Sequence, residues 1–176
     1  MPRILIVDDD TTIQMELEEF LSDTGHTIVG IADTGAEAIE TARRVKPDLI
    51  IMDINLQGEM DGISAAEIIK EEMDTGVVFV TGFDNPEYVE RAKMVEPFGY
   101  VMKPFDEKEI SAVVEIALYK REMELKLKEA QEQSEQRNHD LQKEIRERRK
   151  TQEALFDSEA RYRQLLNTAP AGIYEV

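Results

Sequence analysis

The sequence predicts an α/β fold: a doubly wound parallel sheet followed by a long C-terminal helix. Through residues 1–119, short apolar runs alternate with longer stretches of helical period. Runs this short are typical of parallel strands that are buried on both faces. A charged segment without glycine or proline follows, which favours a long helix that extends into a coiled coil.

The alternation assigns the elements in order along the chain. The expected strands, where apolar side chains follow one another, are 3–7, 27–31, 48–52, 77–81 and 99–102. The expected helices, where apolar residues recur about every 3.6 positions, are 12–23, 35–45, 62–72, 86–95 and a last one from 106 onward. Pro86 suits a first helical turn, and Asp106 can cap the last helix with Glu109 at the capping-box position. Because a helix follows each strand, helices cover both faces of the sheet.

The composition changes sharply after Tyr119, where Glu, Lys, Arg and Gln dominate and no glycine or proline occurs before Pro170. The last helix can therefore continue to about Leu166, a length of roughly 90 Å at 1.5 Å per residue. Such a helix has little to stabilise it without a partner. A lone charged helix is the simpler interpretation, and a parallel two-stranded coiled coil is the one we favour.

The leucines of this helix support pairing. Leu127, Leu141 and Leu155 share one heptad position, and Ile145 lies on the adjoining seam. Polar residues occupy other seam positions, namely Ser134, Asn138 and Arg148. We therefore expect a coiled-coil segment at 120–157.

Leu118 and Leu125 keep a different phase from the leucines of the seam. A stutter is therefore expected where the folded unit, residues 1–119, passes into the coil.

The formal net charge of −17 argues against binding to nucleic acid or to an anionic membrane, since either needs a basic surface. The acidic excess belongs to residues 1–119, because residues 120–176 carry equal numbers of acidic and basic side chains. The chain has no cysteine, and two histidines, His26 and His139, leave little for a zinc site. Without a recognisable signal peptide or membrane span, we expect a soluble, cytoplasmic protein.

Polar residues stand at the ends of the apolar runs, and the carboxyl ends of parallel strands meet at one edge of a sheet. Asp8 and Asp9 follow the first strand, and Asp53 follows the third. Three carboxylates in a small volume repel one another unless a cation is bound. Mg²⁺ prefers oxygen ligands and leaves room for a phosphoryl oxygen beside its waters. These aspartates are therefore candidate ligands of Mg²⁺.

Thr81 and Lys103 end the fourth and fifth apolar runs and supply complementary chemistry. The ammonium group can neutralise a developing phosphoryl charge, and the hydroxyl can hydrogen-bond a phosphoryl oxygen. The nucleophile must be a carboxylate, since no cysteine, serine or histidine lies at these strand ends. The sequence thus predicts a phosphoryl-transfer site.

Residues 1–119 resemble the receiver domain of two-component response regulators. The motifs that carry the resemblance are Val7-Asp8-Asp9-Asp10, Met52-Asp53-Ile54-Asn55, Asp61-Gly62, Thr81, Tyr100 and Lys103-Pro104-Phe105, in the family's order and spacing. The resemblance implies a flavodoxin-like fold in which Asp53 accepts a phosphoryl group from a phosphohistidine of a histidine kinase or phosphotransfer protein. The chain would catalyse its own phosphorylation and dephosphorylation at Asp53, without a kinase catalytic domain.

The resemblance also implies the roles of the surrounding residues. Asp8 and Asp9 would hold Mg²⁺ together with Asp53 and the backbone carbonyl of Asn55.

Thr81 and Lys103 would bind phosphoryl oxygens, and the peptide bond between Lys103 and Pro104 would be cis. On phosphorylation the Thr81 hydroxyl would move inward and Tyr100 would pack behind it. The surface expected to change is formed by 86–95, 99–102 and the helix from 106.

A second resemblance covers the C-terminal part of the chain. Residues 141–149, 153–155 and 158–163 look like the signalling helix that precedes PAS sensor domains, and residues 165–173 look like the lead-in of that domain. This implies a homodimer through the C-terminal helix and the truncated start of a PAS domain at 158–176, which a longer parent protein would continue.

Three alternatives compete with this interpretation. His139 could be a phosphodonor on a dimeric helix, although Asn138-His139-Asp140-Leu141 lacks the His-Glu-x-x-x-x-Pro pattern of kinase dimerisation helices. An aspartyl phosphatase of the haloacid dehalogenase type would need a second carboxylate two residues after Asp53, where Asn55 stands. The third alternative is a constitutive coiled-coil dimerisation module with an inert pseudo-receiver.

Overall fold

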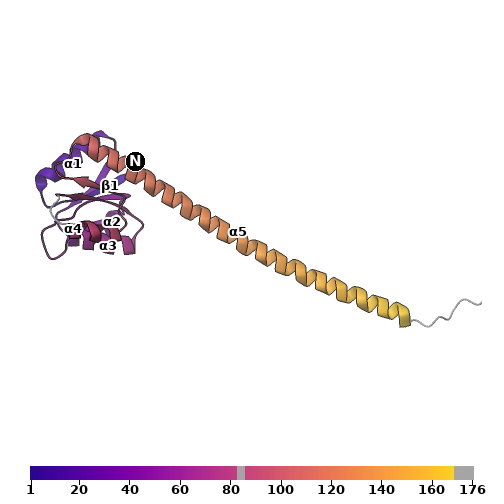
Figure 1. Ribbon diagram of the computed structural model, residues 1–176. Coiled ribbons are helices and arrows are strands. Elements are labelled where there is room, and N and C mark those ends of the chain that lie inside the picture. The colour runs from indigo at the N-terminus through magenta and orange to yellow at the C-terminus, as the bar shows by residue number, and fades with distance from the viewer. Residues whose placement is uncertain (83–85, 169–176) are drawn as a thin grey trace, which may run out of the picture. The chain divides into compact units, whose positions relative to one another are not determined.

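The computed structural model describes residues 1–82 and 86–168 and has two compact units, Met1–Leu125 and Lys126–Val176. Strand and helix alternate through the first unit, as Figure 1 shows. The elements are β1 (Arg3–Val7), α1 (Thr11–Asp23), β2 (Thr27–Ala32), α2 (Gly35–Val45), β3 (Leu49–Asp53), α3 (Gly62–Glu72), β4 (Gly76–Thr81), α4 (Pro86–Met94), β5 (Gly99–Met102) and α5 (Glu107–Thr168).

The five strands form one parallel sheet in the order β2-β1-β3-β4-β5. The chain proceeds from β1 to one edge and then, from β3, towards the other edge, so its direction reverses between these two central strands. In doubly wound sheets the carboxyl ends of such strands border a crevice that holds the functional site. The predicted flavodoxin-like fold is confirmed.

Each face of the sheet is covered by its own set of helices. Successive strand residues point to opposite faces, which gives two hydrophobic clusters. One cluster joins α2, α3 and α4 to the strand side chains Leu5, Val7, Ile50, Met52, Val77 and Phe79. The other joins α1 and α5 to Ile4, Ile6, Leu49, Ile51, Val78, Val80 and Val101. The continuous apolar runs of the sequence are explained by this burial on both faces.

The helix starts follow from local capping. Asp106 Oδ1 accepts a hydrogen bond of 2.9 Å from the backbone N–H of Glu109, and Pro86 is the first residue of α4, as predicted. Asp10 Oδ1 likewise accepts from the N–H of Thr12 at 2.8 Å and caps α1. The third aspartate of the N-terminal triplet is therefore a helix cap.

The long C-terminal helix is confirmed, since α5 is continuous from Glu107 to Thr168. In the first unit it buries Ile110, Val114 and Ala117 against the sheet, and Leu118 packs on the same cluster. Leu118 thus differs in phase from the heptad leucines because it faces its own sheet.

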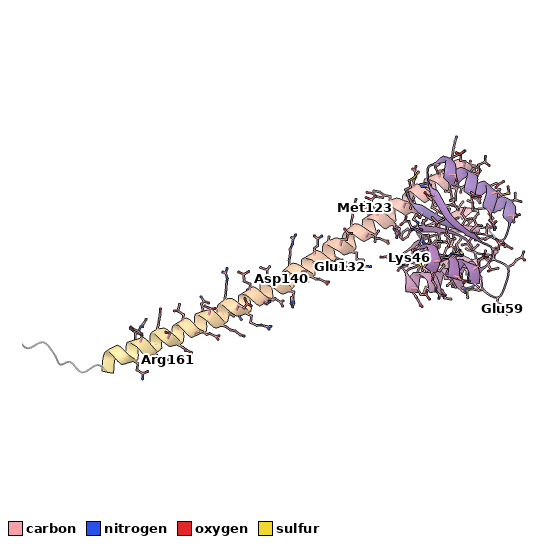
Figure 2. The ribbon with its side chains drawn as sticks, turned by 180° about the vertical axis from the view of Figure 1, so that it is seen from behind. Lys46, Glu59, Met123, Glu132, Asp140 and Arg161 are labelled. Carbon is pink, nitrogen blue, oxygen red and sulfur yellow. The ribbon has the colours of Figure 1, made fainter. Side chains whose placement is uncertain are left out.

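The described side chains of the second unit, residues 126–164, are all exposed. They stand out along α5 in Figure 2, where Glu132, Asp140 and Arg161 are labelled. The last part of the expected PAS start, residues 169–176, lies outside the described residues. Among the described helices, none combines the length and the apolar character needed to cross a membrane.

Candidate functional site

The site lies at the carboxyl ends of β1 and β3, where the chain reverses. Val7 pairs with Met52 in the sheet, so the next residues, Asp8 and Asp53, emerge side by side. Both carboxylates are buried, Asp8 at 1% and Asp53 at 5% exposure. Two buried carboxylates need a compensating cation or hydrogen bonds.

Lys103 balances the negative charge of both carboxylates. Its Nζ donates to Asp8 Oδ2 at 2.7 Å and to Asp53 Oδ2 at 2.6 Å. The lysine directly follows β5, and its backbone N–H donates to the carbonyl of Thr81 at 2.9 Å. The Lys103–Pro104 peptide bond is cis, as expected. Three strand ends therefore contribute to one ionic cluster.

Burial and ion pairing shift the pKa values of Asp8 and Lys103 in opposite directions. Burial raises the pKa of Asp8 above its ordinary value, although hydrogen bonds from Lys103 and from the Asp10 backbone partly oppose it. Burial alone would lower the pKa of Lys103, but its hydrogen bonds to Asp53 and Asp8 outweigh this and raise it. Lys103 is therefore charged throughout the neutral range.

Backbone amides hold the second oxygen of each carboxylate. Asp10 N–H donates to Asp8 Oδ1 at 2.9 Å, and Asn55 N–H donates to Asp53 Oδ1 at 3.0 Å. Each carboxylate is thereby fixed at both oxygens, and Asn55 lies next to Asp53 at the exposed mouth of the site.

Asp9 completes a cluster of oxygen donors. Asp8, Asp9 and Asp53 each offer a carboxylate oxygen, and these atoms lie within 4.8 Å of one another. Two of these residues are buried and Asp9 is half-buried, so the cluster opens to solvent on one side. Oxygen ligands at this density fit a hard divalent cation, which can keep several of its waters.

Thr81 and Tyr100 lie on neighbouring strands. Thr81 ends β4 and is 9% exposed, whereas Tyr100 on β5 is 39% exposed. In the register of β4 and β5, Phe79 pairs with Tyr100 and Thr81 with Met102. Thr81 and Tyr100 therefore face the same side of the sheet, and the Tyr100 ring lies 6.1 Å from that of Phe79, centroid to centroid.

Gln14 is a site residue that the sequence analysis missed. This buried side chain of α1 donates from Nε2 to the Asp8 carbonyl at 2.6 Å and to Asp33 Oδ1 at 2.7 Å. It thus ties the end of β1 to the loop after β2. The available signal was a polar residue on an apolar stripe, three positions before Leu17 and seven before Leu21.

The sequence analysis also assigned no role to Gly62, the first residue of α3. A Cβ atom at this position would lie 1.9 Å from the backbone oxygen of Asp53. The Gly62 N–H donates to the carbonyl of Ile54 at 3.0 Å. The glycine therefore allows α3 to begin directly against the backbone that carries Asp53.

Asp61 connects the loop after β3 to α4. It caps α3 by accepting from the N–H of Ser64 at 2.8 Å, and its Oδ2 accepts from Arg91 Nη1 at 2.7 Å. Burial opposes ionisation of Asp61, but the hydrogen bonds from Arg91 and Ser64 prevail and lower its pKa.

We expect Asp61→Asn to lower the free energy of unfolding by roughly 0.5–1 kcal/mol at pH 7, because the ion pair is lost and asparagine still caps the helix. Because folding lowers the pKa of Asp61, its ionised carboxylate stabilises the fold fully at pH values above the unfolded pKa of about 3.9. This stabilisation is lost as the pH falls through the pKa of Asp61 in the folded state. Urea unfolding should therefore show a smaller difference between the two proteins at pH 3 than at pH 7. An equal difference at both values would contradict the ion-pair origin, and Arg91→Gln should reproduce the effect.

The family of the response regulator receiver domain matches residues 4–115. The chain is 39% identical over 116 residues to the transcriptional regulatory protein PdtaR of Mycobacterium tuberculosis, covering 66% of this chain and 56% of that one. It is 34% identical over 118 residues to the phyllosphere-induced regulator PhyR of Methylorubrum extorquens, covering 66% and 43%. The chain thus spans about half the length of these curated relatives.

Solved structures give the same result. The signal receiver domain of a modulated diguanylate cyclase from Desulfovibrio desulfuricans G20 aligns with a TM-score of 0.67 at 32% identity, covering 70% of this chain and 98% of that one. The N-terminal domain of a response regulator/sensory box/GGDEF three-domain protein from Carboxydothermus hydrogenoformans aligns with a TM-score of 0.65 at 37% identity and the same coverage. The chain belongs to the response regulator receiver domain family.

Proposed function

We propose that this chain is the phosphoacceptor of a two-component phosphorelay and that Asp53 takes the phosphoryl group from a phosphohistidine of a histidine kinase or phosphotransfer protein. The observation that carries the proposal is the buried cluster in which Lys103 contacts both Asp8 and Asp53. An oxygen of Asp53 attacks phosphorus, a P–O bond forms, and the P–N bond to the donor imidazole breaks. The imidazole nitrogen leaves with the bonding electrons and takes up a proton.

The other residues of the site stabilise the charge on the phosphoryl group during this transfer. Asp8, Asp9, Asp53 and the carbonyl of Asn55 would hold Mg²⁺, which supplies positive charge to the phosphoryl oxygens when bound. Lys103 can move from its carboxylate partners to a phosphoryl oxygen.

The Thr81 hydroxyl binds another oxygen of the phosphoryl group. Water later attacks the same phosphorus, the P–O bond to Asp53 breaks, and inorganic phosphate leaves while Asp53 returns to a carboxylate, so the chain catalyses its own dephosphorylation.

The switch that follows involves Thr81 and Tyr100. The position of both on one face of neighbouring strands supports coupling between them. When Thr81 turns towards the phosphoryl group, Tyr100 packs inward from its partly exposed position, and the surface of α4, β5 and α5 changes.

The signal would pass into the C-terminal helix. We propose a receiver domain at 1–119, a coiled-coil signalling helix at 120–157 that forms a parallel homodimer, and the start of a PAS domain at 158–176. The exposure of all described side chains from 126 to 164 supports a missing helical partner, because an isolated helix of this kind is marginal in water. The Carboxydothermus relative is described as a response regulator/sensory box/GGDEF three-domain protein, which supports a further domain after this segment.

The experiment that tests the acceptor role is intact mass after incubation with acetyl phosphate. Wild type should gain one phosphoryl group with Mg²⁺ and none with a chelator, and Asp53→Asn should gain none in either condition. Asp23→Asn, which changes an exposed aspartate at the end of α1, is the matched control and should behave as wild type. No gain in wild type would contradict the proposal and favour a constitutive coiled-coil dimerisation module with an inert pseudo-receiver.

A further inference from the structure

One peptide bond joins Asp8 to Asp9, two members of the carboxylate cluster. Its carbonyl oxygen belongs to Asp8 and accepts the hydrogen bond of 2.6 Å from Gln14 Nε2. Because the peptide unit is planar, the direction of this carbonyl fixes the ψ angle of Asp8, and that angle sets where Asp9 begins relative to Asp8. The amide of Gln14 therefore acts on the relative position of two metal-ligand candidates.

Backbone amides form the neighbouring hydrogen bonds of this turn. The N–H of Asp8 donates to the carbonyl of Ala32 at 3.1 Å, and the N–H of Asp10 donates to Asp8 Oδ1 at 2.9 Å. The N–H of Gln14 donates to the carbonyl of Asp10 at 3.0 Å. These bonds persist whatever side chain stands at position 14. The bond to the Asp8 carbonyl, in contrast, depends on the Gln14 side chain.

Asp33 holds the Gln14 amide in its orientation. Nε2 also donates to Asp33 Oδ1 at 2.7 Å, so each of its two protons has an acceptor. The amide oxygen cannot take the place of the nitrogen here, because it would face a carbonyl and a carboxylate, which are both acceptors. Gln14 is 8% exposed, so water cannot easily replace either bond. The side chain is therefore fixed at its polar end.

Asp33 is itself tied to the start of α2. Its N–H donates to Glu37 Oε2 at 3.1 Å, and the N–H of Glu37 donates to Thr34 Oγ1 at 3.2 Å. Thr34 is the N-cap of α2, and Glu37 lies in the first turn of that helix. The acceptor that orients Gln14 is thus attached to the first turn of a helix.

We propose that Gln14 is a positioning residue for Mg²⁺ binding: its amide holds the Asp8 carbonyl so that the carboxylates of Asp8 and Asp9 reach the same cation, and Asp33 holds the amide. The inference rests on the proposed function for the identity of the cation. Residues that orient metal ligands typically change metal affinity by about 10–100-fold when they are replaced. Gln14 therefore acts on the affinity for Mg²⁺ and has no contact with the phosphoryl group.

The test is the dissociation constant of Mg²⁺ from the full chain, measured by isothermal titration calorimetry with Mg²⁺ as the only added ligand. Gln14→Met keeps an unbranched side chain of similar length and removes the donor protons. Leu17→Val is the matched control, because it changes another buried residue of α1 that packs in the hydrophobic core. Circular dichroism and urea unfolding show whether each variant folds.

We expect Gln14→Met to raise the dissociation constant of Mg²⁺ about tenfold or more, and Leu17→Val to leave it within about twofold of wild type. In saturating Mg²⁺ the rate at which Gln14→Met is phosphorylated by acetyl phosphate should return to within about threefold of wild type, since the defect is in binding. A folded Gln14→Met protein with the wild-type dissociation constant would overturn the inference, even if its stability is reduced.

Asp33 gives a second comparison that does not depend on a buried substitution. Asp33→Ala and Asp33→Asn remove the same charge from an exposed position, but asparagine keeps an oxygen that accepts from Gln14. The dissociation constant of Mg²⁺ should be at least about threefold higher for Asp33→Ala than for Asp33→Asn. Equal values would overturn the inference, as would a wild-type chain that binds no Mg²⁺. Wild type that binds Mg²⁺ but is not phosphorylated would contradict the proposed function alone.

Discussion

Replacing Lys103 with methionine is expected to slow phosphorylation of Asp53 by about 100-fold or more, the usual cost of removing one preorganised group that stabilises transition-state charge. Methionine keeps most of the volume of the side chain and removes its ammonium group. The variant also leaves Asp8 and Asp53 without their shared cation in a buried site. The measurement is the rate at which intact mass increases with acetyl phosphate and Mg²⁺.

Two further variants make this experiment decisive. Lys108→Met removes an exposed lysine of α5 and should phosphorylate at the wild-type rate. Lys103→Arg keeps the positive charge, which guards against the loss of folding that an uncompensated pair of carboxylates can cause. Because guanidinium and ammonium groups differ in shape, its rate should lie between those of wild type and Lys103→Met. A Lys103→Met rate within about threefold of wild type would remove Lys103 from the mechanism.

Gly62→Ala is expected to lower the free energy of unfolding by about 3 kcal/mol or more, the upper range for overpacking a buried site. The new Cβ would lie 1.9 Å from the Asp53 backbone oxygen, 2.9 Å from its carbonyl carbon and 3.0 Å from Met52 Cγ. Backbone atoms cannot rotate away as a flexible side chain can, so either β3 or the start of α3 must shift. Urea unfolding followed by far-ultraviolet circular dichroism measures the change.

Gly82→Ala is the matched control for this substitution. Among the described residues, no atom lies within 4 Å of a Cβ built on Gly82, and the backbone of Gly82 is not in the left-handed region. Its free energy of unfolding should therefore stay within about 0.5 kcal/mol of wild type. Equal effects of the two substitutions would show that the close approach at Gly62 has no energetic consequence. A displaced Asp53 should also make Gly62→Ala phosphorylate more slowly than Gly82→Ala.

The convergence of the site could be predicted because it depends on strand order and direction. Asp8, Asp53 and Lys103 each follow an apolar run, and parallel strands bring such positions to one edge regardless of how the helices pack. The cap at Asp106 could be predicted for a similar reason, since it depends on residues three positions apart. Both signals can be seen in short stretches of sequence. The parallel direction of the strands then determines where those stretches lie in the fold.

The hydrogen-bond and ion-pair partners of the site residues could not be predicted from the sequence. Lys103 contacts Asp8 and Asp53 across 95 and 50 residues of sequence, and Gln14 Nε2 donates from α1 to the Asp8 carbonyl and to Asp33 in the loop after β2. Such contacts depend on the distances and rotamers that the packed layers impose. No periodicity or spacing contains that information.

The sequence by itself therefore determined the parallel α/β architecture, the cluster of carboxylates with its lysine, and the length of the C-terminal helix, because hydrophobic period and helix propensity act over neighbouring residues. Only the tertiary structure decided which oxygen each donor contacts, why Gly62 must lack a side chain, and which side of α5 faces the sheet. Leu118 illustrates the difference: its spacing along the helix was evident, but its partner was not. Packing against a particular surface is a property of the folded chain, since the surface exists only once distant segments have come together.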